Sequence, residues 1–301
     1  MTSPSIAVVI LTYNEEKHIG RCLRHAQALT DEVHVVDSFS SDATVEIAQS
    51  MGAQVWQHPF ENHARQLEWA LAQLPIAAEW VMRIDADEIV SPPLAAEIHE
   101  ALLSAPPSVN GFLVFRQVCF QGAPIRHGGV PHWVLRLWRK GMAKVEQRWM
   151  DEHVVLKEGT SSCLRGDFLD DNLNGVAWWT DKHNGYSTRE AIDLLNYRHR
   201  FRPMAGQLPL PRQARRIRWF KENLYARLPL GLRAFLFFVY RMVFRLGILD
   251  GRGGFVFHFL QGYWYRFLVD VKVRAVEQRM QSDGVDCAEA IRREFGVEPL
   301  L

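Results

Sequence analysis

Apolar runs alternate with helix-like segments over the first ninety residues of this chain. The first run, residues 6–11, contains only apolar residues, which is typical of a strand covered on both faces. Strands of this kind separated by helices indicate a parallel, doubly wound α/β sheet. The predicted strands are 6–11, 33–36, 53–57 and 80–84, and the predicted helices are 15–29, 42–51 and 62–74.

Polar residues follow three of these predicted strands. Residues 12–15 follow the first strand, residues 37–42 follow the second, and residues 85–87 follow the fourth. Ligands of doubly wound sheets bind outside the carboxyl ends of the strands. We therefore expect the three polar segments to form one site at one edge of the sheet.

The segment Asp85-Ala86-Asp87 carries two carboxylates one residue apart after a buried strand. Uncompensated negative charge in a crevice is costly, and a divalent cation bridging to a diphosphate would remove that cost. Carboxylate oxygens suit Mg²⁺ or Mn²⁺, which keep coordination positions for phosphate. The simpler alternative is a strand that ends in solvated acids.

The composition is that of a globular protein with enough apolar material for a large core. The chain has 301 residues, 48% of them hydrophobic and 23% charged. Its four cysteines include no Cys-x-x-Cys pair, so we expect neither a zinc site nor a disulfide framework, as fits a reducing cytosol. The N-terminal residues lack a basic region, and we expect no secretory signal.

The C-terminal third is basic and aromatic. Twelve Lys or Arg residues and one acid, Glu222, lie between Arg198 and Arg245. Such a mixture suits a membrane interface, an ordinary helical appendage or oligomer contact, or nucleic acid, and we favour the membrane surface. The longest unbroken run of hydrophobic residues there, residues 234–240, is far shorter than the roughly twenty residues of a membrane-spanning helix.

Several motifs follow one another in an order typical of one enzyme family. They are residues 9–15 (VILTYNE), 36–44 (VDSFSSDAT), 64–66 (ARQ), 85–87 (DAD), Gly128-Gly129, 135–139 (LRLWR) and Asp151-Glu152. With these motifs, residues 5–160 resemble a family 2 glycosyltransferase of the GT-A fold. The resemblance is strongest to the bacterial branch that builds lipopolysaccharide cores and exopolysaccharides.

The resemblance implies an inverting, metal-dependent glycosyltransferase of the hexosyltransferase type. It would move a sugar from a nucleotide-sugar donor, with a UDP-sugar favoured, to a hydroxyl of a glycan or polyprenyl-diphosphate-linked acceptor. We expect Mg²⁺ or Mn²⁺ as cofactor, no nucleic acid partner, and a cytoplasmic enzyme held peripherally on the anionic inner face of the cytoplasmic membrane. A homo-oligomer is a further candidate arrangement.

The resemblance also assigns candidate roles to residues. Donor-binding candidates are Thr12, Tyr13, Asn14, Glu15, Asp37, Arg65, Asp85, Ala86, Asp87 and Arg136. Asp85 and Asp87 would hold the metal, with His153 or His183 as an additional ligand. The attacking hydroxyl needs a general base, and Glu152 is favoured over Asp151 for this role. Arg136 and Arg139 are expected to face the cleft together.

Structural alternatives exist for several of these residues. Asp37 could form a turn, and Asp42 could cap the helix that follows it. Arg65 could be a solvated helix residue, and Trp178 and Trp179 could pack in a core rather than stack on a sugar.

Two other functions compete with glycosyl transfer. A nucleotidyltransferase acting on sugar phosphates would also combine an α/β sheet with acidic metal ligands, but the segment after the first strand has no glycine to hold a triphosphate. A non-catalytic scaffold that binds a nucleotide sugar or a membrane would not need all of the acidic motifs.

We expect a GT-A catalytic domain over residues 1–181, with a mostly parallel, Rossmann-like central sheet flanked by helices. Residues 1–90 would form its nucleotide-sugar half and residues 91–181 its acceptor half. Residues 182–301 would form a helical, basic and aromatic C-terminal extension that contacts a membrane interface or another subunit.

Overall fold

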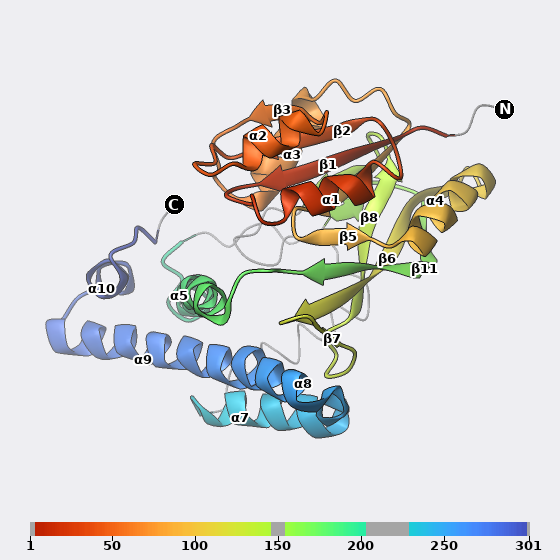
Figure 1. Cartoon of the computed structure of the whole chain (residues 1–301). Helices are drawn as coiled ribbons and strands as arrows, with labels where there is room; N and C mark the ends of the chain where they lie inside the picture. The colour runs from red at the N-terminus through yellow and green to blue at the C-terminus, as the bar shows by residue number, and fades with distance from the viewer. Residues whose placement is uncertain (1–3, 146–153, 203–228, 300–301) are drawn as a thin grey trace. The chain divides into compact units, whose positions relative to one another are not determined.

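The computed structural model describes residues 4–145, 154–202 and 229–299 (Figure 1). The chain divides into two compact units, Met1–Asn174 and Gly175–Leu301. The first unit is mixed α/β and the second is helical, so the predicted GT-A type fold with a helical C-terminal region is confirmed. The domain limit expected after residue 181 falls inside helix α5 (Val176–His199), whereas the division between the units precedes this helix.

The described residues of the first unit form a nine-stranded central sheet. Its strand order is β3-β2-β1-β4-β8-β6-β11-β5, with β7 paired to β6. The strands are β1 (Ile6–Thr12), β2 (Val33–Asp37), β3 (Gln54–Gln57), β4 (Trp80–Asp85), β5 (Glu88–Val90), β6 (Val109–Phe120), β7 (Ala123–Ile125), β8 (His132–Arg139) and β11 (Thr160–Asp171). The first four are parallel, and β8 runs antiparallel between β4 and β6.

Both faces of the parallel strands are covered, as the apolar runs predict. Alternate residues of β1 enter two separate cores, Val8 and Ile10 on one face and Ala7 and Val9 on the other. The first core is completed by helices α1 (Ile19–Ala26), α2 (Thr44–Ser50) and α4 (Pro92–Ser104). The second is completed by α3 (His63–Gln73) and by the strand pair β9 (Ala143–Val145) and β10 (Val154–Leu156).

Helix α1 begins later than the predicted start at Glu15. The Glu15 backbone carbonyl accepts hydrogen bonds from the amides of His18 and Ile19, and the Glu15 carboxylate accepts from the His18 ring at 2.6 Å. The His18 Nε2 atom accepts a hydrogen bond from the backbone amide of Leu173 at 2.9 Å, so the Nδ1 atom carries the hydrogen and donates to the Glu15 carboxylate. These contacts hold the residues before Ile19 in a turn.

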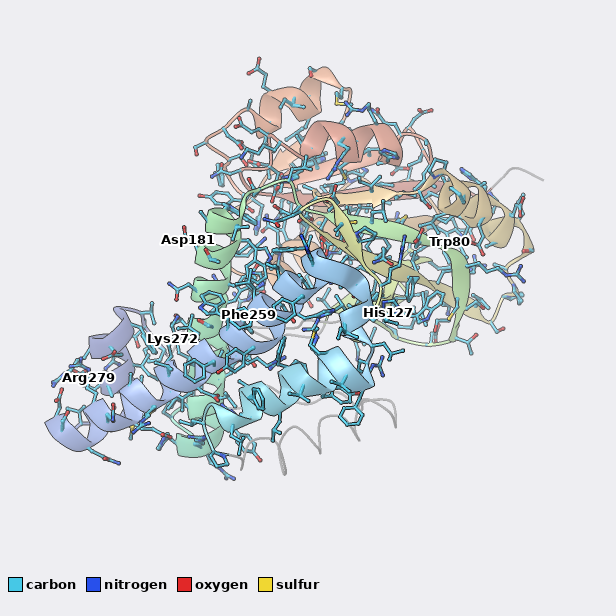
Figure 2. All side chains as sticks on the ribbon, turned by 60° about the horizontal axis from the view of Figure 1, so that its bottom comes forward. Trp80, His127, Asp181, Phe259, Lys272 and Arg279 are labelled. Atoms are coloured by element: carbon cyan, nitrogen blue, oxygen red, sulfur yellow. The ribbon has the colours of Figure 1, made fainter. Side chains whose placement is uncertain are left out.

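The described part of the second unit is helical. Its helices are α5, α7 (Leu232–Val239), the π-helical turn η2 (Tyr240–Phe244), the 3₁₀ turn η3 (Gly247–Asp250), α8 (Gly251–Phe257), the π-helical turn η4 (His258–Trp264), α9 (Tyr265–Asp283) and α10 (Cys287–Phe295). Ile192 and Leu195 of α5 pack with Val269 and Val273 of α9 and with Ile291 of α10. Figure 2 marks Lys272 and Arg279 along α9.

Six of the twelve basic residues of the C-terminal third, between Arg212 and Arg227, lie outside the described residues. The helices of the described ranges include none with both the length and the apolar character needed to cross a bilayer.

Candidate active site

The carboxyl ends of β2, β1 and β4 lie side by side. Strand β1 pairs in parallel with both neighbours, which places Thr12 opposite Asp37 and Leu11 opposite Asp85. The polar residues that follow the three strands therefore share one edge of the sheet. The topology brings together segments that are far apart in the sequence, as the alternation of strands and helices predicts.

Asp37 is fully buried at this edge and is surrounded by hydrogen-bond donors. Its carboxylate accepts from the Thr12 hydroxyl at 3.2 Å, from the Ser40 amide at 2.8 Å and from the Gln57 side chain at 3.5 Å. A buried carboxylate needs such donors, because an unsatisfied one costs several kcal/mol, on the order of 2–7. Asp37 thus closes the turn after β2, and its fixed carboxylate borders the site.

The loops after β1 and β2 are tied to each other. Asn14 and Phe39 both adopt positive φ angles, 54° and 60°. The Asn14 amide donates to the Ser40 hydroxyl at 2.8 Å, and the Asn14 side chain accepts from the Ser41 amide at 2.9 Å. Tyr13 and Phe39 remain 59% and 55% exposed. The two loops therefore present two aromatic rings to solvent on a hydrogen-bonded frame.

Asp42 has a structural role, because its carboxylate accepts hydrogen bonds from backbone amides at the start of the following helix and in the loop after β1. Its carboxylate accepts from the Thr44 amide at 3.0 Å and from the Glu16 amide at 3.1 Å. Partial burial works against ionisation, but the hydrogen bonds from Thr44 and Glu16 lower the pKa of Asp42 below its usual value. Asp42 thereby joins the start of α2 to the loop after β1.

Gln66, rather than Arg65, points into the molecule at the start of α3. The Gln66 side chain is 1% exposed and donates to the Ser38 hydroxyl at 3.2 Å and to the His58 carbonyl at 3.1 Å. The Arg65 side chain is 58% exposed and forms an ion pair with Glu61, one helical turn away. The contact with Glu61 agrees with the alternative that Arg65 is a solvated residue on the helix surface. The first turn of this helix adjoins the end of β2, because Gln66 contacts Ser38.

Asp85 contacts two guanidinium groups. One carboxylate oxygen accepts from Arg83 at 3.0 and 3.1 Å, and the other accepts from Arg136 at 3.1 Å. Burial raises the energy of the charged form, but the two arginines outweigh it and hold the pKa of Asp85 well below its usual value. Asp85 is therefore an ionised carboxylate in a fixed orientation, with about a third of its side chain exposed.

Beneath Asp85 lies Glu88, whose side chain is 2% exposed. It forms an ion pair with Arg136 and accepts a hydrogen bond from the Asp85 amide at 2.9 Å. Burial raises the pKa of Glu88 to about 8, and the neighbouring Asp85 adds to the shift against the attraction of Arg136. Arg116 approaches Glu88 to 4.0 Å and pairs with Asp170, so acids and arginines alternate below the edge of the sheet.

Arg136 is thus directed at the acidic motif, and Arg139 is not. Strand β8 is antiparallel to β4 and places Arg139 opposite Trp80, the first residue of β4, whereas Asp85 is the last. Arg139 pairs with Glu79 and lies over the Trp80 ring at 4.5 Å. The expectation that Arg136 and Arg139 face the cleft together is therefore wrong, because the strand direction sends them to opposite ends of β4.

Asp87 carries the second carboxylate of the motif. It is partly exposed, and its carboxylate accepts from the Asn172 side chain at 2.9 Å. Ala86 between them is buried in the core, which anchors the turn. The donor set fits a hard divalent cation, because Asp87 offers oxygen atoms at the open edge and Asp85 is already ionised. Within the residues that the structure describes, no group of three or more His, Cys, Asp or Glu side chains is arranged to hold a metal ion.

The remaining candidates fall elsewhere. Asp151, Glu152 and His153 lie outside the described residues. His183 lies in the second unit, where its ring stacks on Trp179 with centroids 3.5 Å apart and burial lowers its pKa to about 4. Trp178 is 37% exposed, with the Lys182 ammonium 4.6 Å from its ring.

Several residues of this network escaped the sequence reasoning. Arg83 has a local signal, since it precedes Asp85 by two positions on one strand and therefore shares its side of the sheet. Glu88 directly follows the acidic motif and could have been suspected. Arg116 and Asp170 lie on strands distant in sequence, Asn172 directly follows β11, and none of the three has a local signal.

Comparison with known proteins now identifies the class. The family described as Glycosyl transferase family 2 matches residues 7–173, which is more than half of the chain. The fold, the polar strand ends and this match define a glycosyltransferase enzyme. The chain belongs to glycosyltransferase family 2.

The relatives at the sequence level are bacterial or phage glycosyltransferases. An uncharacterized glycosyltransferase of Rickettsia typhi is 29% identical over 208 residues, which cover 65% of this chain and 70% of the relative. A similar protein of Rickettsia prowazekii is 41% identical over 93 residues, 31% of each chain. The SPbeta prophage-derived glycosyltransferase SunS of Bacillus subtilis is 33% identical over 97 residues, which cover 30% of this chain and 21% of SunS.

Among solved structures, the chain is similar to glucosyl-3-phosphoglycerate synthase from Mycobacterium tuberculosis in complex with Mn²⁺, UDP and glucosyl-3-phosphoglycerate. The identity is 26%, the TM-score is 0.33, and the match covers 38% of this chain and 44% of the synthase. The chain thus spans less than half of that structure.

Proposed function

We propose that this glycosyltransferase moves a sugar, with inversion at the anomeric carbon, from a nucleoside diphosphate donor to a hydroxyl group of a glycan acceptor. The observation that carries the proposal is the shared edge of β2, β1 and β4, where Asp37 and Thr12 adjoin Asp85. A nucleotide sugar has a nucleoside at one end and a charged diphosphate beyond it. The hydrogen-bonding loops after β1 and β2 and the acidic turn after β4 match these two parts in order.

The nucleoside would lie against the loops after β1 and β2. Tyr13 is exposed there and can stack on a base, while Thr12, Asn14 and Glu15 border the same rim. Asp37 lies at the same edge, and its carboxylate could accept from a base imide or a ribose hydroxyl. An imide donor is present in uracil, which supports a UDP-sugar.

The diphosphate would lie over the acidic turn. Asp87 and the exposed part of Asp85 would hold Mg²⁺ or Mn²⁺, and the cation, when bound, would neutralise charge on the departing nucleoside diphosphate. Arg83 and Arg136 keep Asp85 ionised and fix its orientation. Arg65 could exchange its contact with Glu61 for a phosphate oxygen, because both side chains of this ion pair are exposed to water.

The acceptor hydroxyl needs a group that removes its proton as it attacks. We assign this role to Glu152, with Asp151 as the second candidate, and both precede β10 in the chain. His153 remains a candidate ligand of the cation beside them, and His183 a more distant one. The acceptor itself would be a lipid-linked glycan of bacterial lipopolysaccharide or exopolysaccharide synthesis, met at the inner face of the cytoplasmic membrane.

A thermal shift screen of nucleotide sugars with and without Mn²⁺ tests the donor. A UDP-sugar should raise the melting temperature more with Mn²⁺ than without it, because binding to the folded state stabilises it by mass action. Stabilisation by nucleoside triphosphates and sugar phosphates instead would favour a nucleotidyltransferase and overturn the proposal.

Substitution of the proposed base then tests the chemistry. Glu152→Gln should keep donor binding and lose sugar transfer, whereas Glu158→Gln, an exposed acid in the turn before β11, should keep both. Full transfer activity in Glu152→Gln would refute the assignment of the base.

A further inference from the structure

The turn that joins η2 to α8 exposes a cluster of large apolar side chains. Val243, Phe244, Leu246, Ile248 and Leu249 are each more than half exposed, and Phe244 reaches 74%. We call these five residues the apolar turn. Single exposed apolar residues are common on protein surfaces, but five within seven consecutive positions form a patch of the kind that marks a binding surface.

The apolar turn is built as a fixed structure. Leu246 adopts a left-handed conformation with φ 58°, and the Leu249 amide donates to the Leu246 carbonyl at 2.9 Å. Gly247 packs so tightly that a Cβ atom there would lie 2.8 Å from the His258 ring. The His258 ring is buried and hydrogen bonds to Asp250 at 3.1 Å. The exposed side chains are therefore carried by a backbone that packs tightly against the buried His258 ring.

The charges around the apolar turn have one sign at the surface. Arg245 lies within it, between Phe244 and Leu246, Arg252 follows it by three residues, and both are exposed. The sequence from residue 229 to residue 276 contains two acids, Asp250 and Asp270. Asp250 is buried against His258, and Asp270 is buried against Arg233 at 2.6 Å. Burial of both carboxylates leaves the arginines to set the surface charge of this part of the chain.

We propose that the apolar turn inserts into the interface of an anionic lipid bilayer. The proposal rests on the membrane-linked acceptor proposed above and names the segment that makes the contact. Apolar side chains enter the boundary between headgroups and acyl chains, while neighbouring arginines meet lipid phosphates. Tyr240, 45% exposed one helical turn before Phe244, has the amphipathic ring that is enriched at headgroup level.

The opposite charge of the lipid favours this occupant over a second protein surface. A self-complementary contact through the apolar turn would bring the exposed Arg245 and Arg252 of two copies together, and like charges at an interface are unfavourable. Two further exposed aromatic residues follow the turn, Phe255 in α8 and Phe259 in η4, and their rings stack on each other. Figure 2 labels Phe259.

Vesicle flotation with the full chain tests the proposal. The wild type should float with vesicles of phosphatidylcholine and phosphatidylglycerol, and about tenfold less with phosphatidylcholine alone. The triple variant Phe244→Ser, Ile248→Ser and Leu249→Ser should lose about a hundredfold or more of vesicle affinity, since each apolar side chain withdrawn from water contributes about tenfold. Thermal unfolding of the variant checks that it remains folded.

A control variant replaces three exposed large side chains elsewhere, those of Leu103, Tyr197 and Val297, by Ser. This control should float like the wild type. Equal flotation of both triple variants, or no flotation of the wild type, would overturn the proposal. A wild-type dimer that the apolar-turn variant lacks, without vesicle binding, would assign the surface to a protein contact instead.

The two proposals can fail separately. Titration of UDP with Mn²⁺ into the apolar-turn variant should give the wild-type affinity, because the substituted residues belong to the second unit. Loss of flotation with nucleotide binding intact supports the assignment of the turn. Vesicle binding by a wild type that binds no nucleotide would support the membrane contact and refute the donor site.

Discussion

Arg136→Met should destabilise the first unit by an amount that grows above pH 8. Arg136 contacts Asp85 and the buried Glu88, whose pKa is raised to about 8. Below this pH Glu88 is protonated, and loss of Arg136 leaves a buried carboxyl group without its partner. Such an orphaned group costs about 1–3 kcal/mol, so the variant should lose that much free energy of unfolding at pH 6.

The pH dependence follows from proton binding. A raised pKa in the folded state means that the folded wild type binds a proton that the unfolded chain, with an ordinary pKa of 4.5, has released. The stability contributed by this proton is present below pH 4.5 and is lost as the pH rises to 8. Without Arg136 the pKa of Glu88 rises further, so the loss continues beyond pH 8. The wild type itself still loses a few tenths of a kcal/mol over this range, so the difference in free energy of unfolding between wild type and variant should widen by about 1 kcal/mol between pH 8 and pH 9.

Urea unfolding at pH 6, 8 and 9 measures these differences. Two controls separate the buried pair from general effects of losing an arginine. In a Glu88→Gln background, Arg136→Met should show no widening above pH 8. Arg139→Met, which removes an arginine paired with the half-exposed Glu79, should show a pH-independent loss of about 1–2 kcal/mol. The reasoning would be refuted by a difference in free energy of unfolding between wild type and Arg136→Met that stays constant from pH 6 to pH 9. It would also be refuted if this difference still grew above pH 8 in the Glu88→Gln background.

Three further substitutions have defined outcomes. Asp37→Asn turns an amide donor toward the Ser40 amide and should cost about 1–3 kcal/mol in urea unfolding; an unchanged midpoint would contradict the buried network. Gly247→Ala places a methyl group against the His258 ring and should lower stability by about 1–3 kcal/mol. Gly185→Ala, in an open position of α5, should raise stability by about 0.5–1 kcal/mol, and equal effects of the two glycine substitutions would contradict the packing described.

The strands of the nucleotide-binding side could be predicted because their signals are local. An uncharged run such as residues 6–11 has one favourable environment, the interior of a covered sheet, and the turns after it are marked by polar residues. The antiparallel insertion of β8 between β4 and β6 has no comparable signal. Its pairing with β4 joins residues more than fifty positions apart, which propensity does not encode.

The acidic motif shows the same limit at the level of single residues. The pattern at Asp85 and Asp87 predicts two acids at a strand end, but not their different surroundings. Arg136 reaches Asp85 only through strand pairing, so the sequence could not show that one carboxylate is held by arginines and the other by Asn172. The π-helical turns η2 and η4, which shape the exposed apolar surface, likewise depend on packing within the second unit.

The most direct test of the central claim is calorimetric titration of UDP with and without Mn²⁺. In the wild type, Mn²⁺ should raise the affinity for UDP by about tenfold or more, equivalent to 1.4 kcal/mol. Asp87→Asn should keep the metal-free affinity and lose the increase. Asp31→Asn, which changes an exposed acid before the opposite end of β2, should behave like the wild type. A Mn²⁺-dependent increase that survives in Asp87→Asn would contradict the assignment of the diphosphate and its metal to this edge of the sheet.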